Sequence, residues 1–263
     1  MRSKWLLLTA GFGSPDMNAA AERVKSQAIS LGIFDRVLAF SDADLETACP
    51  DVYKNYREYL SPSHKGFGYF SWKVELVSSA LSGKFGDFDG VVWVDAGCEI
   101  YNAPWTRWRL RRWLKQTEKK GVFAYTLSTP EQDFTKKTLF NLFPNLNKED
   151  RSPQFQATWF ILHGEKGRSI ANEWFRIALL NISTLDLSAS PGGEVPSFVE
   201  HRSEQSILSL ILKNNKENSA KFYFPYSGFG TYKSQVIALT NPIWVSRNRS
   251  GRSIIGSQFH LKR

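Results

Sequence analysis

The sequence predicts an α/β fold with a mainly parallel central sheet flanked by helices. Short apolar stretches of strand length alternate with amphipathic stretches of helix length through the first half of the chain. Strands separated by helices of that size are typical of βαβ units, in which successive strands run parallel. The chain has 263 residues, of which 42% are apolar and 22% charged, so we expect one globular domain over residues 1–263.

Each expected element follows from a local pattern. Apolar runs bounded by turn residues predict strands at 5–10, 36–40, 91–94, 122–127 and 157–162. Apolar residues at helical spacing predict helices at 18–31, 69–81, 104–119, 169–180 and 203–212. The stretch from the end of the 122–127 strand to Pro153 is rich in loop-forming residues. The Pro-, Gly- and Ser-rich stretch 188–197 is also expected to be a loop.

Composition narrows the class of partner. The formal net charge of +9 favours anionic partners such as nucleic acid, an acidic membrane surface or a phosphorylated small molecule. Aromatic residues make up 14% of the chain, and their flat faces suit sugars or bases as well as core packing. Because the sequence has no RNA- or DNA-binding motif, we expect no nucleic-acid partner. A basic nucleic-acid-binding protein without catalysis is the alternative outside the enzymes.

The cysteines and the N-terminal segment bear on the cellular compartment. Cys49 and Cys98 give neither a disulfide framework nor a CxxC metal pair, so we expect a reducing, cytoplasmic setting. The start, MRSKWLLLTA, has a basic flank, but its apolar core is shorter than that of a signal peptide. We interpret it as the first strand. No stretch reaches the length of a transmembrane helix.

The strand at 91–94 ends in Asp95, which is followed by the small residues Ala96 and Gly97. In an open α/β sheet, ligands bind in the crevice beyond the carboxyl ends of the strands. A carboxylate there can hold a divalent cation or accept hydrogen bonds from sugar hydroxyls, and small neighbours let a bulky ligand approach the backbone. The alternative is structural, since Asp is a favoured cap for a following turn or helix.

Three segments resemble those of one enzyme family. VVWVDAG (91–97) resembles the acidic D-x-D motif of glycosyltransferases with the GT-A fold. GFGYFSWKVELVSSAL (66–81) resembles the G-x-G-Y-W-x-W-K segment of bacterial members, and FVEHRSEQSILSLIL (198–212) resembles their H-R-x-D-Q-S-I helix start. The resemblance implies a single GT-A-like domain, with a Rossmann-like nucleotide-sugar-binding half at about 1–130 and an acceptor-binding half at about 131–263.

The same resemblance implies Mn²⁺ or Mg²⁺ as a cofactor, with Asp95, Glu99 and His260 as candidate metal ligands. The chain departs from the family at the third position of D-x-D, where Gly97 replaces the usual metal-binding acid. Three possibilities stay open: Asp95 bears the metal itself, Glu99 substitutes for the missing acid, or the enzyme needs no tightly held metal.

The residues expected to contact the nucleotide sugar come from three places. By resemblance, the end of the first strand cradles the nucleotide, through Thr9, Ala10 and Gly11. Gly97 is expected to let the donor approach the backbone. Trp72 and Lys73 lie near the start of the 69–81 helix, where a helix N-terminus and a lysine both favour phosphate. For Trp72, packing against the sheet is the alternative.

The segment that opens the last helix supplies the expected catalytic and acceptor-binding residues. By resemblance, Glu204 and Gln205 lie near the sugar and the acceptor hydroxyl, together with Asp95 as the third catalytic residue. A carboxylate base, or an amide that stabilises a developing cation, makes chemical sense there. Substrate binding is expected of His201, Arg202 and Gln156. A structural role at a strand edge is the alternative for Gln156.

The segment 105–120, WTRWRLRRWLKQTEKK, has two different faces on a helical wheel. The apolar side, which we expect to face the core, comprises Leu110, Trp113 and Leu114. The basic side, which lies beside Trp108, comprises Arg107, Arg111 and Lys115. A basic face with an exposed tryptophan suits an anionic membrane surface or a lipid-linked acceptor, which would make the protein peripheral at the inner face of the membrane. A solvated basic helix without a partner is the alternative.

These features predict a hexosyltransferase that moves a hexose from a nucleotide diphosphate sugar to a glycan or lipid-linked saccharide acceptor. We expect this enzyme to act in the synthesis of cell-surface polysaccharides. A sugar nucleotidyltransferase on a similar sheet is a further alternative. Such enzymes usually carry a basic residue in the loop after the first strand, and GFGSPD (11–16) has none.

Overall fold

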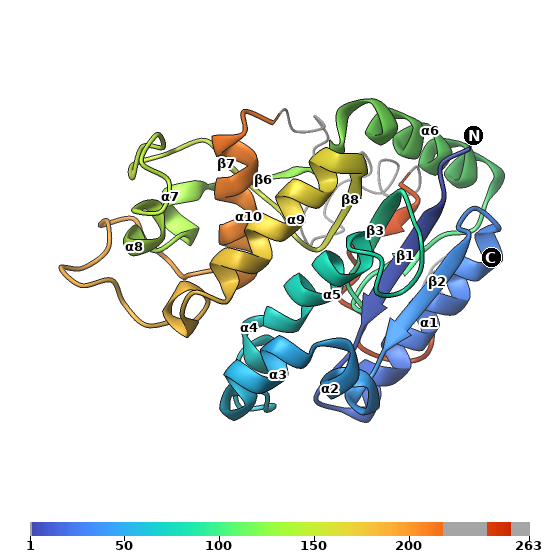
Figure 1. Cartoon of the computed structure of the whole chain (residues 1–263), viewed down its shortest axis with the longest axis horizontal. Coiled ribbons are helices and arrows are strands. Elements are labelled where there is room, and N and C mark those ends of the chain that lie inside the picture. The colour runs from blue at the N-terminus through green and yellow to red at the C-terminus, as the bar shows by residue number, and fades with distance from the viewer. Residues whose placement is uncertain (1, 218–240, 254–263) are drawn as a thin grey trace, which may run out of the picture.

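The computed structural model describes residues 2–217 and 241–253, and its centre is a five-stranded sheet with helices on both faces (Figure 1). The strand order is β2-β1-β3-β8-β5. The strands are β1 (Trp5–Ala10), β2 (Arg36–Phe40), β3 (Gly90–Val94), β5 (Val122–Phe123) and β8 (Trp159–His163). The expected α/β class is confirmed, since four of the five strands run in the same direction.

One strand runs against the others, which the sequence did not predict. β2, β1 and β3 pair in parallel, whereas β8 is antiparallel to both β3 and β5. The chain leaves β5 at the carboxyl edge of the sheet and returns to the same edge before β8, so β8 has to run the other way. Residues 124–158, between these strands, therefore depart from the edge where β3 ends.

One face of the sheet is covered by α5 (Ser71–Leu81) and α9 (Gly164–Ala178), and α10 (Ser203–Asn214) packs against α9. Leu6, Leu8 and Trp93 enter this core from the strands. They alternate with residues that enter the opposite core, because successive side chains of a strand point to opposite faces. Figure 1 shows α5, α9 and α10 side by side between the sheet and the short helices at the far left.

The other face is covered by α1 (Pro15–Leu31) and α6 (Pro104–Lys120). Trp5, Leu7 and Val92 enter this second core from the strands. The expected inward side of α6 is confirmed, since its three apolar residues are buried there: Leu110, Trp113 and Leu114. With helices on both faces, the strand ends are where a ligand can reach the sheet.

The ends of α1 follow from local chemistry. Ser14 is its N-cap, and the Ser14 hydroxyl accepts a hydrogen bond from the backbone N–H of Met17 at 3.2 Å. Pro15 follows at the first helical position, where its missing N–H has no consequence. The helix ends at Gly32, which adopts a left-handed conformation with φ of 61°.

Two smaller sheets adjoin the central one. β4 (Glu99–Ile100) pairs with β9 (Ile243–Trp244), which brings the 241–253 segment beside the loop that follows β3. β6 (Thr126–Pro130) pairs with β7 (Pro153–Phe155). The remaining elements are short: α2 (Leu45–Ala48), α3 (Pro50–Tyr56), α4 (Gly66–Tyr69), α7 (Glu131–Phe134) and α8 (Lys137–Phe140), with 3-10 turns at Asp42–Asp44, Arg57–Tyr59 and Ile182–Thr184.

Several expected elements have different bounds from those predicted: α1 begins at Pro15 and not at residue 18, and α9 spans Gly164–Ala178 and not 169–180. Two further differences follow from the backbone. The single strand expected at 122–127 is divided between β5 and β6, because the chain turns from the central sheet to pair with β7. The helix expected from residue 69 begins at Ser71. Residues 66–70 all have positive φ, which a right-handed helix does not accommodate.

Replacing Leu110 by Ala should lower the free energy of unfolding by about 2–5 kcal/mol, because Leu110 is fully buried between α6 and the sheet. Urea denaturation followed by circular dichroism measures this loss. Leu187→Ala, at a side chain that is 52% exposed, is the matched control and should change stability by less than about 0.5 kcal/mol. Equal losses from the two variants would contradict the packing of α6 described above.

Candidate functional site

A cavity of about 650 Å³ opens at the carboxyl ends of β1 and β3, a size typical of small-molecule sites. It is bounded by the loop after β1, the turn before α5, the 95–97 loop, the first turn of α10 and the 241–253 segment. Ser14 and Met17, at the N-terminal end of α1, also line it. The positive end of the α1 dipole therefore lies at this cavity.

Three ionisable side chains on the cavity wall form what we call the Lys73 cluster: Lys73, Asp95 and Glu204. The ammonium of Lys73 lies 2.9 Å from Oδ1 of Asp95 and 2.7 Å from Oε1 of Glu204. It also donates to the carbonyl oxygen of Ala157 at 3.3 Å. Lys73 and Glu204 are buried, whereas the side chain of Asp95 is 28% exposed. The cluster thus joins α5, α10 and the end of β3, and Asp95 is the more exposed of its two carboxylates.

The Lys73 cluster holds one cation between two acids, so its net charge is −1 when all three groups are ionised. Burial raises the pKa of Glu204 to about 7, against the opposing effect of the Lys73 ammonium. Burial also disfavours the charged form of Lys73, but the adjacent Asp95 and Glu204 outweigh burial and raise the Lys73 pKa. Glu204 is therefore the member of the cluster that exchanges a proton near neutral pH.

The turn before α5 has an unusual backbone conformation. From Gly66 to Phe70, five consecutive residues have positive φ, which costs about 1–2 kcal/mol for each residue that is not glycine. A Cβ at Gly66 would lie 2.3 Å from the Phe70 ring, so glycine is required there. The turn is stabilised by a hydrogen bond of 3.0 Å from the Trp72 indole to the carbonyl oxygen of Gly66. It directs Phe67 and Phe70 to the cavity.

An aromatic wall is the result of this turn. Phe67, Phe70 and Trp72 line the cavity together with Phe12 from the loop after β1. The Phe12 ring contacts that of Trp72 edge-on, with 4.7 Å between the ring centroids, and stacks on Phe67 at 6.1 Å. Trp72 packs in the core at 5% exposure, as the structural alternative expects, and it also borders the cavity, so its contact with the donor stays a prediction. Flat apolar rings suit a nucleobase or a sugar ring.

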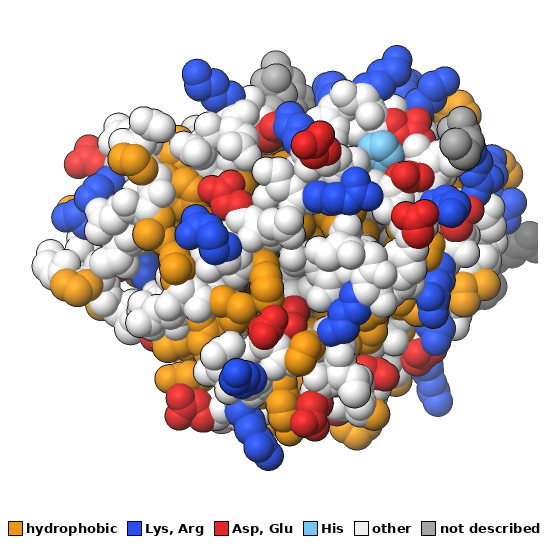
Figure 2. All heavy atoms as spheres, viewed as in Figure 1, with side chains coloured by type: hydrophobic (Ala, Val, Ile, Leu, Met, Phe, Trp, Pro, Cys, Tyr) orange, Lys and Arg blue, Asp and Glu red, His pale blue; other side chains and the backbone are white. Residues whose placement is uncertain are grey.

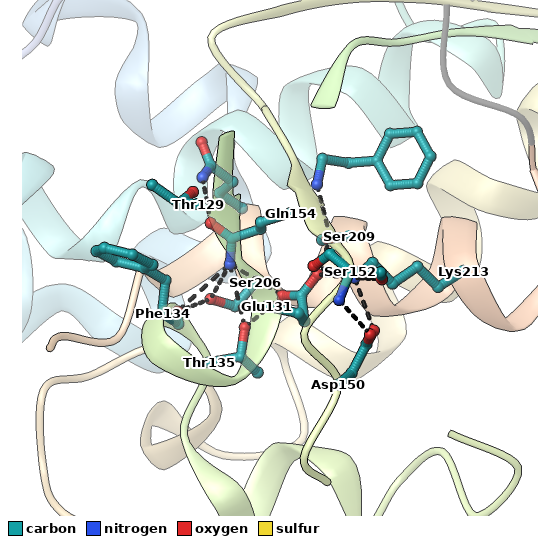
Figure 3. Close-up of polar contacts among 12 residues, drawn as sticks. Thr129, Glu131, Phe134, Thr135, Asp150, Ser152, Gln154, Ser206, Ser209 and Lys213 are labelled. Atoms are coloured by element: carbon teal, nitrogen blue, oxygen red, sulfur yellow. Dashed lines mark hydrogen bonds and ion pairs between the residues drawn. The ribbon is translucent and has the colours of Figure 1, made fainter. Parts of the chain in front are cut away.

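A buried polar network holds the first turn of α10 (Figure 3). Oε1 of Gln154 accepts hydrogen bonds from Nε2 of Gln205 at 2.7 Å and from the Arg202 guanidinium at 3.2 Å. Nε2 of Gln154 donates to Oε1 of Glu131 at 2.9 Å. The fully buried Glu131 also contacts three further side chains, those of Thr135, Ser209 and Lys213. This network orients the residues that flank Glu204.

Another wall of the cavity comes from the 241–253 segment, which contributes Arg247 and Arg249. The segment is held by Arg23 of α1, which is only 6% exposed. The Arg23 guanidinium donates to four backbone carbonyl groups, two in the loop after β3 and two in the segment: Ala96, Cys98, Asn248 and Ser250. One buried side chain therefore fixes the 95–97 loop against the arginine-bearing segment.

Eight of the site residues expected from the sequence line this cavity: Ala10, Trp72, Lys73, Asp95, Gly97, Arg202, Glu204 and Gln205. They come from separate parts of the chain, and the sheet topology brings them together. Gln205 has both ends of its amide engaged, since Oε1 accepts from the backbone N–H of Ala157 at 3.2 Å and Nε2 donates to Gln154. Its contacts make it a residue that positions the first turn of α10.

Four residues expected to contact substrate lie away from the cavity: Thr9, Gly11, Gln156 and His201. Thr9 and Gln156 are buried, and Gly11 faces α1 so closely that a Cβ would lie 1.9 Å from the carbonyl oxygen of Met17. The His201 ring lies 2.9 Å from the carbonyl oxygen of Thr184. Burial lowers the pKa of His201 to about 3, so the imidazole is neutral and serves packing.

The expected metal ligands do not come together in the described residues. Glu99 is fully buried, and its carboxylate accepts hydrogen bonds from Asn248 at 2.7 Å and Ser253 at 2.6 Å. His260 lies outside the described residues. Within residues 2–217 and 241–253, no group of three or more His, Cys, Asp or Glu side chains is placed to hold a metal ion.

Asp95 itself does not fit a divalent ion well. Its Oδ1 already accepts hydrogen bonds from the ammonium of Lys73 and from the indole of Trp93, at 2.9 Å and 2.7 Å. A positive ammonium at that distance repels a second cation on the same carboxylate. The residues that the structure describes around Asp95 therefore do not form a metal site.

Sequence reasoning missed several residues that line the cavity: Lys65, Phe67, Glu200, Arg247 and Arg249. Lys65 and Glu200 form an ion pair of 2.8 Å across the cavity edge. The two arginines belong to the basic run SRNRSGR (246–252), which is the signal that could have identified them. Nothing in the sequence indicated that this run lies near Asp95. The pairing of β4 with β9 brings it there, and that pairing joins distant parts of the chain.

No family model and no curated protein matches the sequence. Solved structures similar to this chain include a glycosyltransferase involved in the glycosylation of the major capsid of PBCV-1, at 10% identity and a TM-score of 0.36 over 66% of each chain. Apo WbbM, a bifunctional glycosyltransferase, has 12% identity and a TM-score of 0.47 over 92% of this chain and 45% of its own. Apo mouse xyloside xylosyltransferase 1 has 12% identity and a TM-score of 0.41 over 83% of this chain and 85% of its own. The chain thus spans just under two thirds of the first protein and less than half of the second.

The raised pKa of Glu204 predicts that stability falls as pH rises through the neutral range. Between about pH 5 and pH 7 the folded protein retains a proton that the unfolded chain has released, so ionisation favours unfolding. Over this pH range, we expect the free energy of unfolding of the wild type to fall by about 2–3 kcal/mol relative to that of Glu204→Gln, which has no such proton. Urea denaturation at a series of pH values measures the difference. Parallel pH profiles for the two proteins would refute this assignment.

Proposed function

We propose that the protein is a glycosyltransferase that takes a hexose from a nucleotide diphosphate sugar. The observation that supports this best is the buried ammonium of Lys73, shared by Asp95 and Glu204 at the carboxyl ends of β1 and β3. The resemblance of the sequence to GT-A enzymes gives donor-binding and catalytic roles to the same three residues. A cavity with an aromatic wall and an arginine-bearing wall suits a ligand that has both rings and a diphosphate.

The chemistry of the Lys73 cluster fits sugar transfer. The partly exposed Asp95 carboxylate can accept hydrogen bonds from sugar hydroxyls. Glu204, with a pKa of about 7, is suited to take the proton of an acceptor hydroxyl as it attacks the anomeric carbon. The ammonium of Lys73 holds both carboxylates in place, so that they keep a fixed position relative to the reacting sugar. The acceptor in this proposal is a glycan or a lipid-linked saccharide in cell-surface polysaccharide synthesis.

The outer face of α6 supports a lipid-linked acceptor or an anionic membrane surface as a partner. Trp105 and Trp108 are 50% and 59% exposed, and Arg111 and Lys115 are exposed beside them. In Figure 2, basic and acidic side chains are interspersed over most of the visible face, whereas several Lys and Arg side chains project at the upper right, where α6 runs. None of the described helices combines the length and the apolar character needed to cross a membrane.

A donor screen tests the proposed function. In thermal-shift and nucleotide-release assays against UDP-, GDP-, CMP- and dTDP-sugars, at least one donor should stabilise the protein and be turned over. Asp95→Ala should lower kcat about 10²- to 10³-fold, because a charged group that faces the reacting sugar is lost. Asp87→Ala is the control, at a side chain that is 93% exposed outside the cavity. Donor binding and turnover that persist unchanged in Asp95→Ala would rule out the proposed site.

A vesicle-binding assay tests the α6 surface. The protein should sediment with vesicles of phosphatidylcholine that contain phosphatidylglycerol, and far less with pure phosphatidylcholine. Arg107→Gln/Arg111→Gln/Lys115→Gln should weaken this binding by about 3 kcal/mol in total, or roughly 100-fold, because each basic residue near an anionic surface contributes about 1 kcal/mol. Binding that the triple variant leaves unchanged would show that α6 is only a solvated basic helix.

A further inference from the structure

Within the proposed function, we infer that Arg247 and Arg249 bind the diphosphate of the donor, so that donor binding requires no divalent metal ion. In this arrangement the 241–253 segment supplies the positive charge that a metal ion supplies where a D-x-D motif is complete. The inference rests on the proposed function, but it concerns residues and a metal requirement that the proposal leaves open.

The first support is the position of the segment relative to Gly97. The carbonyl oxygen of Gly97 accepts hydrogen bonds from the backbone N–H of Asn248 at 3.0 Å and the hydroxyl of Ser246 at 3.1 Å. A Cβ at Gly97 would point at the Cα of Arg247, 3.6 Å away. The backbone of Arg247 therefore lies in van der Waals contact with the position where the side chain of a second D-x-D acid would begin.

The second support is the backbone of Arg247. Its φ of 54° is in the left-handed region, which costs of the order of 1–3 kcal/mol for a residue other than glycine. The surrounding contacts maintain this conformation, since the Arg23 guanidinium holds the carbonyl groups of Asn248 and Ser250 on the following residues. Strained residues of this kind cluster at ligand-binding sites, where they fix a side chain in a required position.

The third support is the charge of the cavity. Among the described residues that line it, five side chains are cationic and three are carboxylates, which is an excess of two positive charges when all of them are ionised. The cationic residues are Lys65, Lys73, Arg202, Arg247 and Arg249, and the acidic residues are Asp95, Glu200 and Glu204. An excess of positive charge suits the two negative charges of the diphosphate in a nucleotide diphosphate sugar, whereas a divalent cation would add to that excess.

Calorimetric titration with UDP, GDP and dTDP, each with EDTA and with Mn²⁺, tests the inference. The nucleoside diphosphate that binds should have Kd values within about threefold in the two conditions. Arg247→Gln/Arg249→Gln should weaken binding by about 10²- to 10⁴-fold, because two charged hydrogen bonds are lost and their contributions add. Arg247→Lys/Arg249→Lys should recover part of the affinity, since it retains the charge.

The matched control is Arg151→Gln/Arg176→Gln, which removes the same charge from exposed side chains outside the cavity and should change Kd by less than about twofold. Binding that Mn²⁺ supports and EDTA abolishes would overturn the inference and leave the proposed function standing. Wild-type affinity in the double arginine variant, with native circular dichroism, would overturn it as well. Binding of no nucleoside diphosphate in either condition would refute the proposed function together with the inference.

Discussion

The candidate site depends on one buried ammonium group. Removal of Lys73 from water costs several kcal/mol unless its charge is compensated, and Asp95, Glu204 and the carbonyl oxygen of Ala157 provide that compensation. Because these partners come from β3, α10 and the chain before β8, the ammonium fixes the distances between the elements that enclose the cavity. The same contacts hold two carboxylates a few ångströms apart, at a place where the sheet exposes its strand ends to a ligand.

Buried polar groups outside the cavity hold its walls in position. Glu131 and Gln154 support the first turn of α10 from one direction, and Arg23 ties the 95–97 loop to the 241–253 segment from another. A site that must hold charges at defined distances needs such supporting contacts, because exposed loops alone place side chains loosely. The strained turn at 66–70 acts in the same way on the aromatic wall.

Local pattern was enough to predict much of the fold, and the resemblance of three segments to GT-A enzymes pointed to the residues at the centre of the candidate site. The apolar runs gave the bounds of β1 and β2, and the motifs around Asp95, Lys73 and Glu204 correctly brought these three residues to one cavity. Features that depend on contacts between distant segments were not predictable. The reversed direction of β8 and the pairing of β9 beside Asp95 are set by tertiary contacts, and no residue spacing signals five consecutive positive φ angles. His201 and Gln156 are buried away from the cavity, although they belong to segments in which we expected substrate-binding residues.

We propose that the Lys73 cluster and the 241–253 segment together form the binding site for a nucleotide sugar. A crystal structure of the protein grown with EDTA and a bound nucleoside diphosphate is the decisive experiment. We expect diphosphate oxygens within hydrogen-bonding distance of Arg247 or Arg249, with the base against the aromatic wall that includes Phe12 and Trp72. A nucleotide bound at another surface, with the cavity at β1 and β3 filled by water alone, would contradict it.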